Sequence, residues 1–419
     1  MTHLLDDLAW RGLISQTTDD IALREALDAG PVTLYCGFDP TAPSLHHGNL
    51  VQILTVKRFQ DAGHKPLLLV GGATGLIGDP RMSGERTLNP VDTVHEWVER
   101  IRAQIEPLMS FEGDNAAVMV NNYEWTKDLD AISFLRDVGK YFRMGTMLAK
   151  ENVSRRLASD EGLSFTEFSY QVLQGMDFLE LYRRHGCTLQ TGGSDQWGNL
   201  TAGTELVRKA EGVSVHALAT PLITKADGTK FGKTEGGAVW LAPDMMSPYA
   251  FYQFWVNSDD ADVVNLLKVF TFRSRAEIEE LERLVAKEPF KREAQKVLAW
   301  DVTALVHGHS AADAVVEASQ ALFGRGELSG LDDVTLAGCA AELGGVEVAA
   351  GTTIIDALVA TSVADSKSAA RRAIHEGGAY VNNVKVTDAD ATLETSDHLA
   401  GGWVVVRRGK KTVGLAKVV

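Results

Sequence analysis

Residues 32–49 read VTLYCGFDPTAPSLHHGN, and this stretch decides how the first half of the chain folds. Val32 to Phe38 is an apolar and β-branched run, which is typical of a buried strand. Two prolines in Asp39–Ser44 predict a turn, and a helical pattern then runs from about Leu45 to Asp61 and stops at Gly63. A strand that passes through a turn into a helix presents the free N–H groups of the helix start to any ligand bound there.

The same alternation of strand and helix continues through the first 235 residues. It predicts an α/β fold with a Rossmann-type, doubly wound parallel sheet, whose ligand site lies at the carboxyl ends of the strands. Further strands are expected at 65–72, 116–122, 187–193 and 216–223, and further helices at 94–111, 128–140 and 165–185.

Beyond residue 235 the character of the sequence changes. Residues 262–325 are helical by period and strongly charged, so we expect an α-helical domain over 236–325. Residues 326–351, rich in Gly, Ala, Asp and Glu, are interpreted as a linker with some residual structure. From Gly351 onward nine basic side chains face seven acidic ones, although the whole chain carries a net charge of −15. A basic end on an acidic body can contact a polyanion locally without binding it everywhere.

Composition excludes several classes of protein. The 419 residues are 45% hydrophobic and 23% charged, with no apolar run of about 18 residues that could span a membrane. The N-terminal residues lack the basic and apolar regions of a secretory signal. Three cysteines without a close pair argue against a disulfide framework and a zinc site. We therefore expect a cytoplasmic protein with no membrane partner and no metal site of its own.

The first candidate site is the helix start itself. His46 and Asn49 are three residues apart on one helical face, and both can donate hydrogen bonds to phosphate oxygens. Gly48 lets a flat base or ribose approach the backbone. A capped helix with surface histidines would give the same pattern, so this motif alone does not establish a nucleotide site.

The second candidate is the segment 225–237, KADGTKFGKTEGG. Lys230 and Lys233 lie three apart among glycines, an arrangement suited to holding a polyphosphate, although a solvated surface loop would look alike. The two segments together bracket one α/β domain. Their order and spacing resemble the HIGH and KMSKS signatures of class I aminoacyl-tRNA synthetases, with 46–49 as HIGH and 230–234 as KMSKS.

A third set of residues points to the amino acid. Tyr170, Gln174 and Asp177 follow one another at i, i+4 and i+7, which places them on one helical face. With Tyr35, with GGATGLIGDP at 71–80 and GGSDQWGN at 192–199, they resemble the tyrosine pocket of bacterial-type tyrosyl-tRNA synthetases. The resemblance runs nearly end to end.

The resemblance implies a site for each substrate. The catalytic residues on the triphosphate would be His46, Asn49, Lys230, Lys233 and Thr234. The tyrosine-binding residues would be Tyr35, Asp79, Tyr170, Gln174, Asp177 and Gln196. The ATP-binding residues would be Gly37, Asp39, Thr41, His46, Gly48, Asn49, Arg86, Gly193, Asp195, Lys230 and Lys233.

Within the amino-acid site, the resemblance assigns the substrate phenol to Tyr35 and Asp177. The substrate ammonium is assigned to Asp79, Tyr170 and Gln174. Asp39, Asp195 and Gln196 would orient the carboxylate region and the ribose.

Three departures from the family pattern stand out. Asn49 replaces the second histidine of HIGH, so its hydrogen bond should not titrate near neutrality. The segment 230–234 lacks the Met and the Ser of KMSKS while it keeps both lysines. The loop after Pro80 lacks a lysine often found in relatives, and whether Arg81 replaces its phosphate contact is an open question.

Residues 352–419 resemble the S-four RNA-binding domain of the same synthetases. The match rests on IIDAL at 354–358, on SKSAARRAI at 366–374 and on the glycine-rich strands that follow. Lys367, Arg371 and Arg372 would bind tRNA, since basic residues on one helical face suit a phosphate backbone. Solvated helix charge is the plainer interpretation of the same residues.

The resemblance implies ATP-dependent activation of L-tyrosine and transfer of the tyrosyl group to the terminal adenosine of tRNA(Tyr). ATP enters as a substrate with Mg²⁺, and no tightly bound cofactor is expected. In relatives a segment equivalent to about 119–167 forms a homodimer interface, so we expect a homodimer. Two alternatives remain: a tryptophanyl-tRNA synthetase, which shares both signatures, and a catalytically silent RNA-binding protein on the same scaffold.

Overall fold

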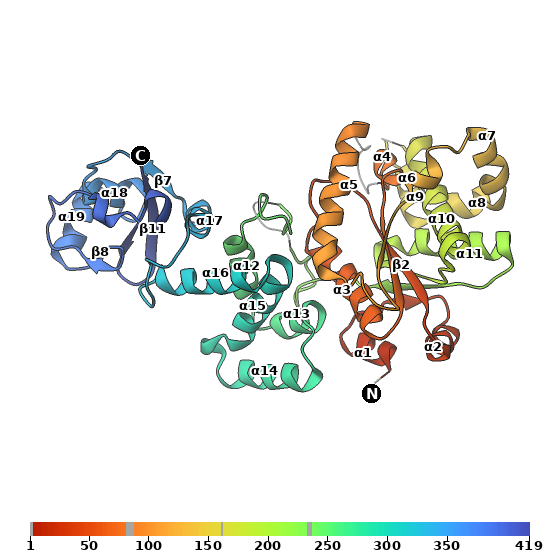
Figure 1. The fold of residues 1–419 in the computed structure, drawn as a ribbon, viewed down its shortest axis with the longest axis horizontal. Helices are drawn as coiled ribbons and strands as arrows, with labels where there is room; N and C mark the ends of the chain where they lie inside the picture. Colours follow the sequence, from red (N-terminus) through yellow and green to blue (C-terminus); the bar gives the residue numbers. More distant parts are fainter. Residues whose placement is uncertain (1–2, 81–87, 161, 233–236) are drawn as a thin grey trace. The chain divides into compact units, whose positions relative to one another are not determined.

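The structure is a computed structural model that describes residues 3–80, 88–160, 162–232 and 237–419 (Figure 1). The chain forms two compact units. The first comprises Met1–Ala242 with Val264–Ser274, and the second comprises Pro243–Val263 with Arg275–Val419. The segment 264–274, expected in the helical domain, therefore groups with the first unit.

The first unit is built on a six-stranded sheet in the order β1-β6-β5-β2-β3-β4. Five strands run parallel, as predicted, and the two-residue edge strand β1, which was not predicted, runs antiparallel to β6. In β2, Tyr35 lies opposite Leu67 of β3 and Gln190 of β5. The strands are β1 (Gln16–Thr17), β2 (Thr33–Phe38), β3 (Lys65–Val70), β4 (Val118–Asn121), β5 (Leu189–Gly193) and β6 (His216–Thr220).

Helices cover both faces of this sheet, as a doubly wound fold requires. Figure 1 shows α3 (His47–Asp61) and α5 (Val91–Ile105) on one side and α10 (Phe165–His185) and α11 (Trp197–Glu211) on the other. The remaining helices of this unit are α1 (Leu4–Trp10), α2 (Asp20–Ala29), α4 (Thr74–Ile77), α6 (Tyr123–Thr126), α7 (Ala131–Ser133), α8 (Met144–Leu148), α9 (Glu151–Leu157) and α13 (Val263–Phe270).

Two predicted helices show what local signals can and cannot fix. The helix expected at 165–185 has those bounds, since Ser164 caps the backbone N–H of Glu167 and Gly186 ends the helix at a φ of 64°. The helix expected at 128–140 is confirmed only in part, because the helical residues begin at Ala131 and their geometry is irregular. That stretch contains the three-residue α7, a π-helical turn at Phe134–Val138 and the start of a 3-10 turn at Gly139–Tyr141.

Two buried arginines attach the segment 264–274 to the first unit. Arg58 donates to the carbonyls of Val269 (3.1 Å) and Thr271 (2.7 Å), and Arg11 donates to the carbonyls of Lys268 (3.0 Å) and Arg273 (2.9 Å). These carbonyls lie at and beyond the end of α13, where helical C=O groups lack intrahelical partners. Burial lowers the pKa of Arg58 to about 9.

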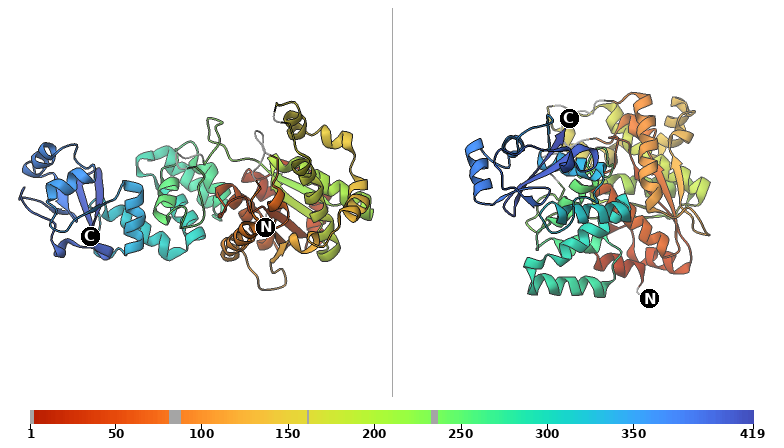
Figure 2. Two further views of the ribbon diagram at one scale, coloured as in Figure 1. Left: turned by 90° about the horizontal axis from the view of Figure 1, so that it is seen from above. Right: turned by 60° about the vertical axis from the view of Figure 1, so that its left-hand side comes forward.

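The second unit combines helices with a five-stranded sheet in the order β7-β11-β10-β8-β9. Its core joins α18 and α19 to one face of the sheet, as Figure 2 also shows. Its elements are α12 (Pro248–Val256), α14 (Arg275–Lys287), α15 (Glu293–His307), α16 (His309–Ala321), α17 (Asp333–Leu343), β7 (Val346–Val348), α18 (Ile354–Ala360), α19 (Lys367–His375), β8 (Ala379–Val381), β9 (Val384–Lys385), β10 (Trp403–Arg408) and β11 (Thr412–Val418).

The stretch 326–351, interpreted as a linker with some residual structure, is more ordered than that interpretation implies. The stretch contains α17, capped by Asp332 and ended by Gly344, and β7, which pairs in parallel with β11. Small residues carry the buried face of α17, including Cys339 and Ala340. Because Gly and Ala dominate, the helix has a weak hydrophobic period and resembles a loop by composition. Among the described residues, no helix is long and apolar enough to cross a membrane.

Candidate active site

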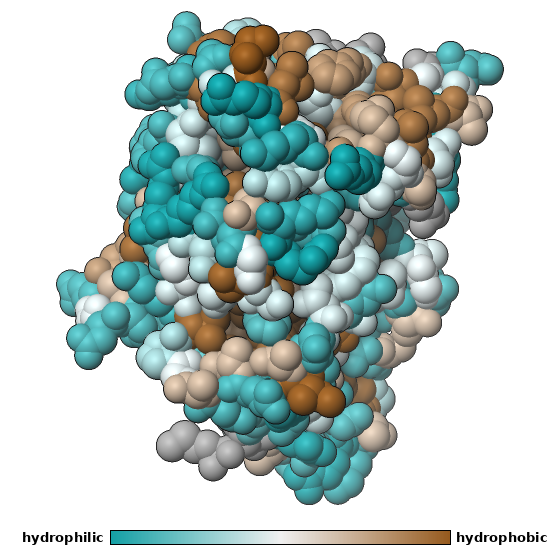
Figure 3. Space-filling model, turned by 90° about the vertical axis from the view of Figure 1, so that its right-hand side faces the viewer, coloured by the Kyte–Doolittle hydropathy of each residue, from teal (hydrophilic) through white to brown (hydrophobic). Residues whose placement is uncertain are grey.

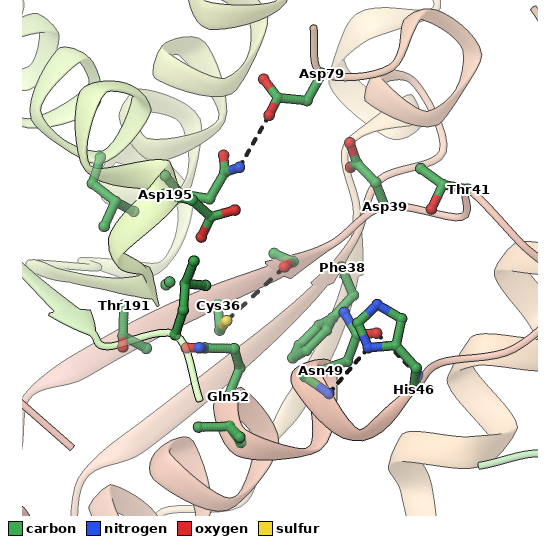
Figure 4. Close-up of a pocket in the computed structure, with 18 of the residues that line it drawn as sticks. Cys36, Phe38, Asp39, Thr41, His46, Asn49, Gln52, Asp79, Thr191 and Asp195 are labelled. Carbon is green, nitrogen blue, oxygen red and sulfur yellow. Dashed lines mark hydrogen bonds between the residues drawn. The ribbon is translucent and has the colours of Figure 1, made fainter. Parts of the chain in front are cut away.

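A cavity of about 740 Å³ opens at the carboxyl ends of β2 and β5, the two neighbouring strands at which the strand order of the sheet reverses (Figure 4). This is the position at which open α/β sheets bind ligands. Most of the predicted site residues line it: Tyr35, Gly37, Asp39, Thr41, His46, Gly48, Asn49, Asp79, Tyr170, Gln174, Asp177, Gly193, Asp195, Gln196 and Lys230. Arg86, Lys233 and Thr234, with Arg81, lie outside the described residues.

One end of the cavity borders the apolar core, and two buried polar groups line it there. Tyr35 is fully buried against Phe178, and within the described chain its hydroxyl has no hydrogen-bond partner. Asp177 accepts hydrogen bonds from Asn122 Nδ2 (3.0 Å) and Trp125 Nε1 (2.9 Å). Burial raises the pKa of Asp177 to about 7, although both hydrogen bonds oppose the shift.

A second group of side chains surrounds Asp39. Its Oδ2 accepts from the Tyr170 hydroxyl (2.7 Å) and its Oδ1 from Thr74 Oγ1 (2.7 Å). A side chain at Gly71 would overlap Asp39 Oδ1, so glycine is required there. The nearby Gln174 Oε1 is buried and has no partner among the described residues. This part of the cavity therefore offers acceptors to a cation or a donor.

Asp79 takes part in a closed hydrogen-bond triangle. Gln196 Nε2 donates to Asp79 Oδ2 (3.0 Å), the contact drawn at the top of Figure 4. Asn199 Nδ2 donates both to Asp79 Oδ1 (3.2 Å) and to Gln196 Oε1 (2.9 Å). Asp79 and Gln196 line the cavity, and Asn199 lies behind them.

The start of α3 forms the more open end of the cavity. His46 Nδ1 accepts from the Gly48 N–H and Asn49 Oδ1 accepts from the His46 N–H, both at 3.0 Å (Figure 4). The acceptor atoms of both side chains are thus used within the cap. His46 Nε2 and Asn49 Nδ2 are left as donors. Burial, together with the charge of Lys230, lowers the pKa of His46, so the neutral ring is favoured.

The lysine segment reaches the same end. It turns back between Thr224 and Lys230, with the Lys225 N–H bonded to the Thr229 carbonyl (2.8 Å). After this turn the segment contacts His47, whose ring centre lies 5.7 Å from that of Phe231. Gly232 has a φ of 80°, and a Cβ there would overlap the His47 ring. Burial lowers the pKa of His47 to about 4, so the His47 ring that contacts the segment is neutral.

Several contributors were missed by sequence reasoning. Asn122 and Trp125 donate hydrogen bonds to Asp177, and Thr74 donates one to Asp39. His47 lies inside the motif at 46–49 but was given no role. Asn122 is the last residue of the strand predicted at 116–122, and this position at a strand end could have marked it. Trp125 lies 52 residues from the carboxylate it contacts, and no local pattern records such a contact.

Cys36 is the thiol that lines the cavity. Burial raises its pKa to about 12, so the thiol is neutral at physiological pH and is a poor nucleophile. The site therefore offers hydrogen-bond donors, acceptors and cationic groups rather than an activated nucleophile. In the described ranges of the chain, no cluster of His, Cys, Asp and Glu is arranged to hold a metal ion.

The predicted RNA-binding residues lie in the second unit and are exposed on α19. Lys367 pairs with Asp356 at 2.6 Å, whereas Arg371 approaches Asp390 at 4.0 Å. A basic hollow of about 670 Å³, which the sequence reasoning did not single out, is lined by Arg325, Arg407, Lys410 and Lys411. Arg407 is 7% exposed and lies 4.2 Å over the Tyr380 ring. The excess of basic residues after Gly351 was the sequence signal that could have indicated this basic hollow.

The first unit is a parallel doubly wound sheet with an acidic and amide-lined cavity at its switch point. A helix start and a lysine segment border this cavity. Together these features define a nucleotide-dependent enzyme. The family model described as "tRNA synthetases class I (W and Y)" matches residues 27–324, so the chain belongs to that family. A second model, "Tyrosine--tRNA ligase SYY-like C-terminal domain", matches residues 337–416.

Within this family the chain groups with the tyrosine–tRNA ligases. It is 63% identical over 419 residues to the tyrosine–tRNA ligase of Streptomyces avermitilis, covering 100% of this chain and 99% of the relative. It is 61% identical to that of Acidothermus cellulolyticus, covering 99% and 98%. The family resemblance drawn from the sequence is confirmed.

Solved structures give the same fold. A C-terminally truncated mitochondrial tyrosyl-tRNA synthetase of Aspergillus nidulans superposes with a TM-score of 0.69 at 29% identity, covering 76% of this chain and 94% of that one. A tryptophanyl-tRNA synthetase of Encephalitozoon cuniculi bound to tryptophan superposes with a TM-score of 0.55 at 15% identity, covering 74% and 87%. The second likeness concerns the fold alone.

Proposed function

We propose that the chain is an ATP-dependent tyrosine–tRNA ligase. Tyrosine carboxylate attacks the α-phosphate of ATP, giving tyrosyl-adenylate and pyrophosphate. The tyrosyl group then passes to a hydroxyl of the terminal adenosine of tRNA(Tyr). The observation that carries the proposal is the pairing, in one cavity, of a buried phenol-sized polar end with a helix start and a lysine at the other end.

Tyr35 and Asp177 bind the substrate phenol. The Tyr35 hydroxyl donates to the phenol oxygen, and Asp177 is the second partner of the same hydroxyl. Asn122 and Trp125 hold the Asp177 carboxyl group by both oxygens, which fixes the direction of its remaining lone pairs. An unpaired buried hydroxyl or carboxyl costs about 1–3 kcal/mol, so a substrate without the phenol oxygen is disfavoured.

Asp79, Tyr170 and Gln174 receive the substrate ammonium. The Tyr170 hydroxyl donates a hydrogen bond to Asp39, so the Tyr170 oxygen can still accept one. Gln174 Oε1 is a buried acceptor without a partner among the described residues. Asp39, Asp195 and Gln196 lie between this group and the nucleotide, where they orient the carboxylate and the ribose.

The triphosphate binds at the start of α3. His46 Nε2, Asn49 Nδ2 and the Lys230 ammonium offer donors to phosphate oxygens, and Lys233, Thr234 and Arg86 are further expected contacts. Gly37, Thr41, Gly48 and Gly193 let the nucleotide approach the backbone. These groups stabilise charge on the pentavalent α-phosphate and on the leaving pyrophosphate, while the cavity holds the two substrates in line. Mg²⁺ arrives with ATP as part of the substrate.

The tRNA partner binds through the second unit. Lys367, Arg371 and Arg372 on α19 supply phosphate contacts, and the hollow around Arg407 adds a second cationic surface. Because Lys367 is already paired with Asp356, we expect it to contribute less than the two arginines. Phosphate contacts of this kind give salt-dependent affinity.

The working state is a homodimer formed by the segment around 119–167. Large apolar side chains are exposed there, including Phe165 (75%) and Ile132 (69%), with Leu135, Met144 and Leu157. Apolar surface gathers at the top of the face shown in Figure 3, on the side of the first unit that carries α7 and α8. Contiguous exposed apolar surface marks an interface. A monomeric mass by light scattering at micromolar concentration would exclude this dimer.

The test of the proposed function is ATP–pyrophosphate exchange with each standard amino acid in turn, with Mg²⁺ and without tRNA. Exchange with tyrosine alone supports the proposal. Exchange with tryptophan would reassign the amino-acid pocket while leaving the enzyme class intact. Absence of exchange from folded protein with every amino acid would favour a silent RNA-binding scaffold.

A further inference from the structure

Asn199 completes the hydrogen-bond triangle with Asp79 and Gln196 but does not line the cavity. We propose that Asn199 is a positioning residue that locks Asp79 and Gln196 in the orientation that receives the ammonium and carboxylate of tyrosine. The inference rests on the proposed function and assigns to this site a residue that does not itself touch the substrate.

The number of donors and acceptors in the triangle allows only one orientation of its three side chains. The Asn199 amide nitrogen carries two hydrogens, and it donates to two acceptors, Asp79 Oδ1 and Gln196 Oε1. Gln196 Nε2 donates to the other oxygen of Asp79. A flipped Gln196 amide would turn its oxygen toward the carboxylate and its N–H groups toward a donor. One orientation of the three groups therefore satisfies all of them.

The triangle holds two side chains that line the cavity. Gln196 has a second N–H, which suits a carboxylate, and the Asp79 carboxylate carries the negative charge that suits an ammonium group. Both residues line the cavity next to Tyr170 and Gln174. A fixed carboxylate binds an ammonium better than a mobile one because its side-chain entropy is lost before binding.

The base of the triangle is itself anchored. Asn199 lies in the first turn of α11, where the Gly198 carbonyl accepts a 2.6 Å hydrogen bond from Lys150 Nζ. Lys150 is also the charged neighbour that interacts with Asp79, and burial lowers its pKa to about 8. The start of the helix is thus held from a separate part of the chain.

A purely local role for Asn199 fits the contacts less well. Gln196 is the N-cap residue of α11, but its side chain makes no capping hydrogen bond. The hydrogen bonds of the Asn199 amide nitrogen go to two side chains, so they do not supply the missing partners of the helix backbone. Loss of the amide should therefore leave α11 intact and disturb the two cavity residues.

The test compares two ligands that differ by one amino group, tyramine and 4-ethylphenol. Their dissociation constants are measured by fluorescence titration on the full chain, for the wild type, for Asn199→Ala and for the control Thr201→Ala. Thr201 lies on the same helix and donates to the Trp197 carbonyl (2.9 Å). It is absent from the cavity lining.

In Asn199→Ala, tyramine binding weakens about tenfold, the scale of one or two lost hydrogen bonds, while 4-ethylphenol binding stays within twofold. Thr201→Ala leaves both unchanged. Asn199→Ser, which keeps one donor, gives an intermediate shift and covers the case in which the alanine variant does not fold. The KM for tyrosine rises in step, and the KM for ATP does not.

Two results overturn the inference in different ways. If the wild type prefers tyramine and Asn199→Ala keeps that preference, or loses both ligands equally, Asn199 does not position the ammonium site. If the wild type itself shows no preference for tyramine, the ammonium site is misassigned. The assignment of Asp79, Tyr170 and Gln174 to the ammonium then fails together with the role of Asn199, while ATP–pyrophosphate exchange with tyrosine tests the proposed function separately.

Discussion

The two ends of the cavity are built in different ways. At the phenol end, Tyr35 and Asp177 belong to a strand and a long helix of the apolar core, and both are buried. At the phosphate end, His46 and Asn49 cap a helix start, and Lys230 stands on an exposed turn. The core fixes a few groups rigidly, which suits selection among amino acids. The loops present many donors, which suits a large, changing phosphate charge.

The largest expected effect breaks the phosphate end alone. In Lys230→Ala the rate of ATP–pyrophosphate exchange falls about 100-fold, since one charged donor to the transition state is lost. Tyrosine affinity, measured by equilibrium titration, stays unchanged because the phenol end is intact.

The matched control is Lys225→Ala on the same turn, since Lys225 is exposed and outside the cavity lining. A loss of tyrosine affinity in Lys230→Ala, or an equal rate loss in Lys225→Ala, contradicts the division between the two ends.

The second prediction concerns the phenol end and its buried carboxyl group. The pKa of Asp177 is raised to about 7 in the folded protein from 3.8, so between pH 4 and pH 7 the unfolded chain is ionised there while the folded chain keeps its proton. Stability from this group is therefore full below pH 4 and is lost as the pH rises toward 7. Its slope is about 1.4 kcal/mol per pH unit.

Calorimetry of ligand-free wild type and Asp177→Asn at pH 5, 6 and 7 checks this. The wild type should lose stability relative to the variant as the pH rises. Parallel pH profiles of the two proteins would show that Asp177 titrates normally and that the phenol end is more solvated than its burial indicates.

The third prediction tests the contact between the lysine segment and the His47 ring. Gly232→Ala places a methyl group on the His47 ring at a φ of 80°, a backbone conformation that costs about 1–2 kcal/mol for an alanine. We expect the KM for ATP to rise about tenfold, with tyrosine binding unchanged.

The double variant His47→Ala/Gly232→Ala separates the two causes. It removes the overlap but not the backbone strain, so part of the loss should be recovered. If the double variant is as impaired as the product of the single ones, His47 is not the seat of the segment.

The same contrast explains what the sequence could predict. The parallel sheet, the helix at 165–185 and the face shared by Tyr170, Gln174 and Asp177 follow from period, cap and spacing, which are local signals. Prediction was less accurate at 128–140, where the helix is irregular, and at 326–351, which is more ordered than a linker, because small or mixed residues blur the period in both stretches. The partners of Asp177, Asn122 and Trp125, are more than 50 residues away and depend on how β4 and α10 pack. The tertiary fold creates those contacts, so local patterns carry no record of them.

The most direct measurement is also the one with the smallest expected effect. Tyr35→Phe removes one hydroxyl from the phenol end, and kcat/KM for exchange is measured with tyrosine and with phenylalanine on wild type and variant. The variant loses one hydrogen bond to tyrosine and no longer leaves a buried hydroxyl unpaired beside phenylalanine, a combined difference of about 1–1.4 kcal/mol. The ratio of the two kcat/KM values should therefore fall about fivefold to tenfold in favour of phenylalanine. An equal loss for both substrates would remove Tyr35 from the phenol site and contradict the claim that the buried end of the cavity selects the amino acid.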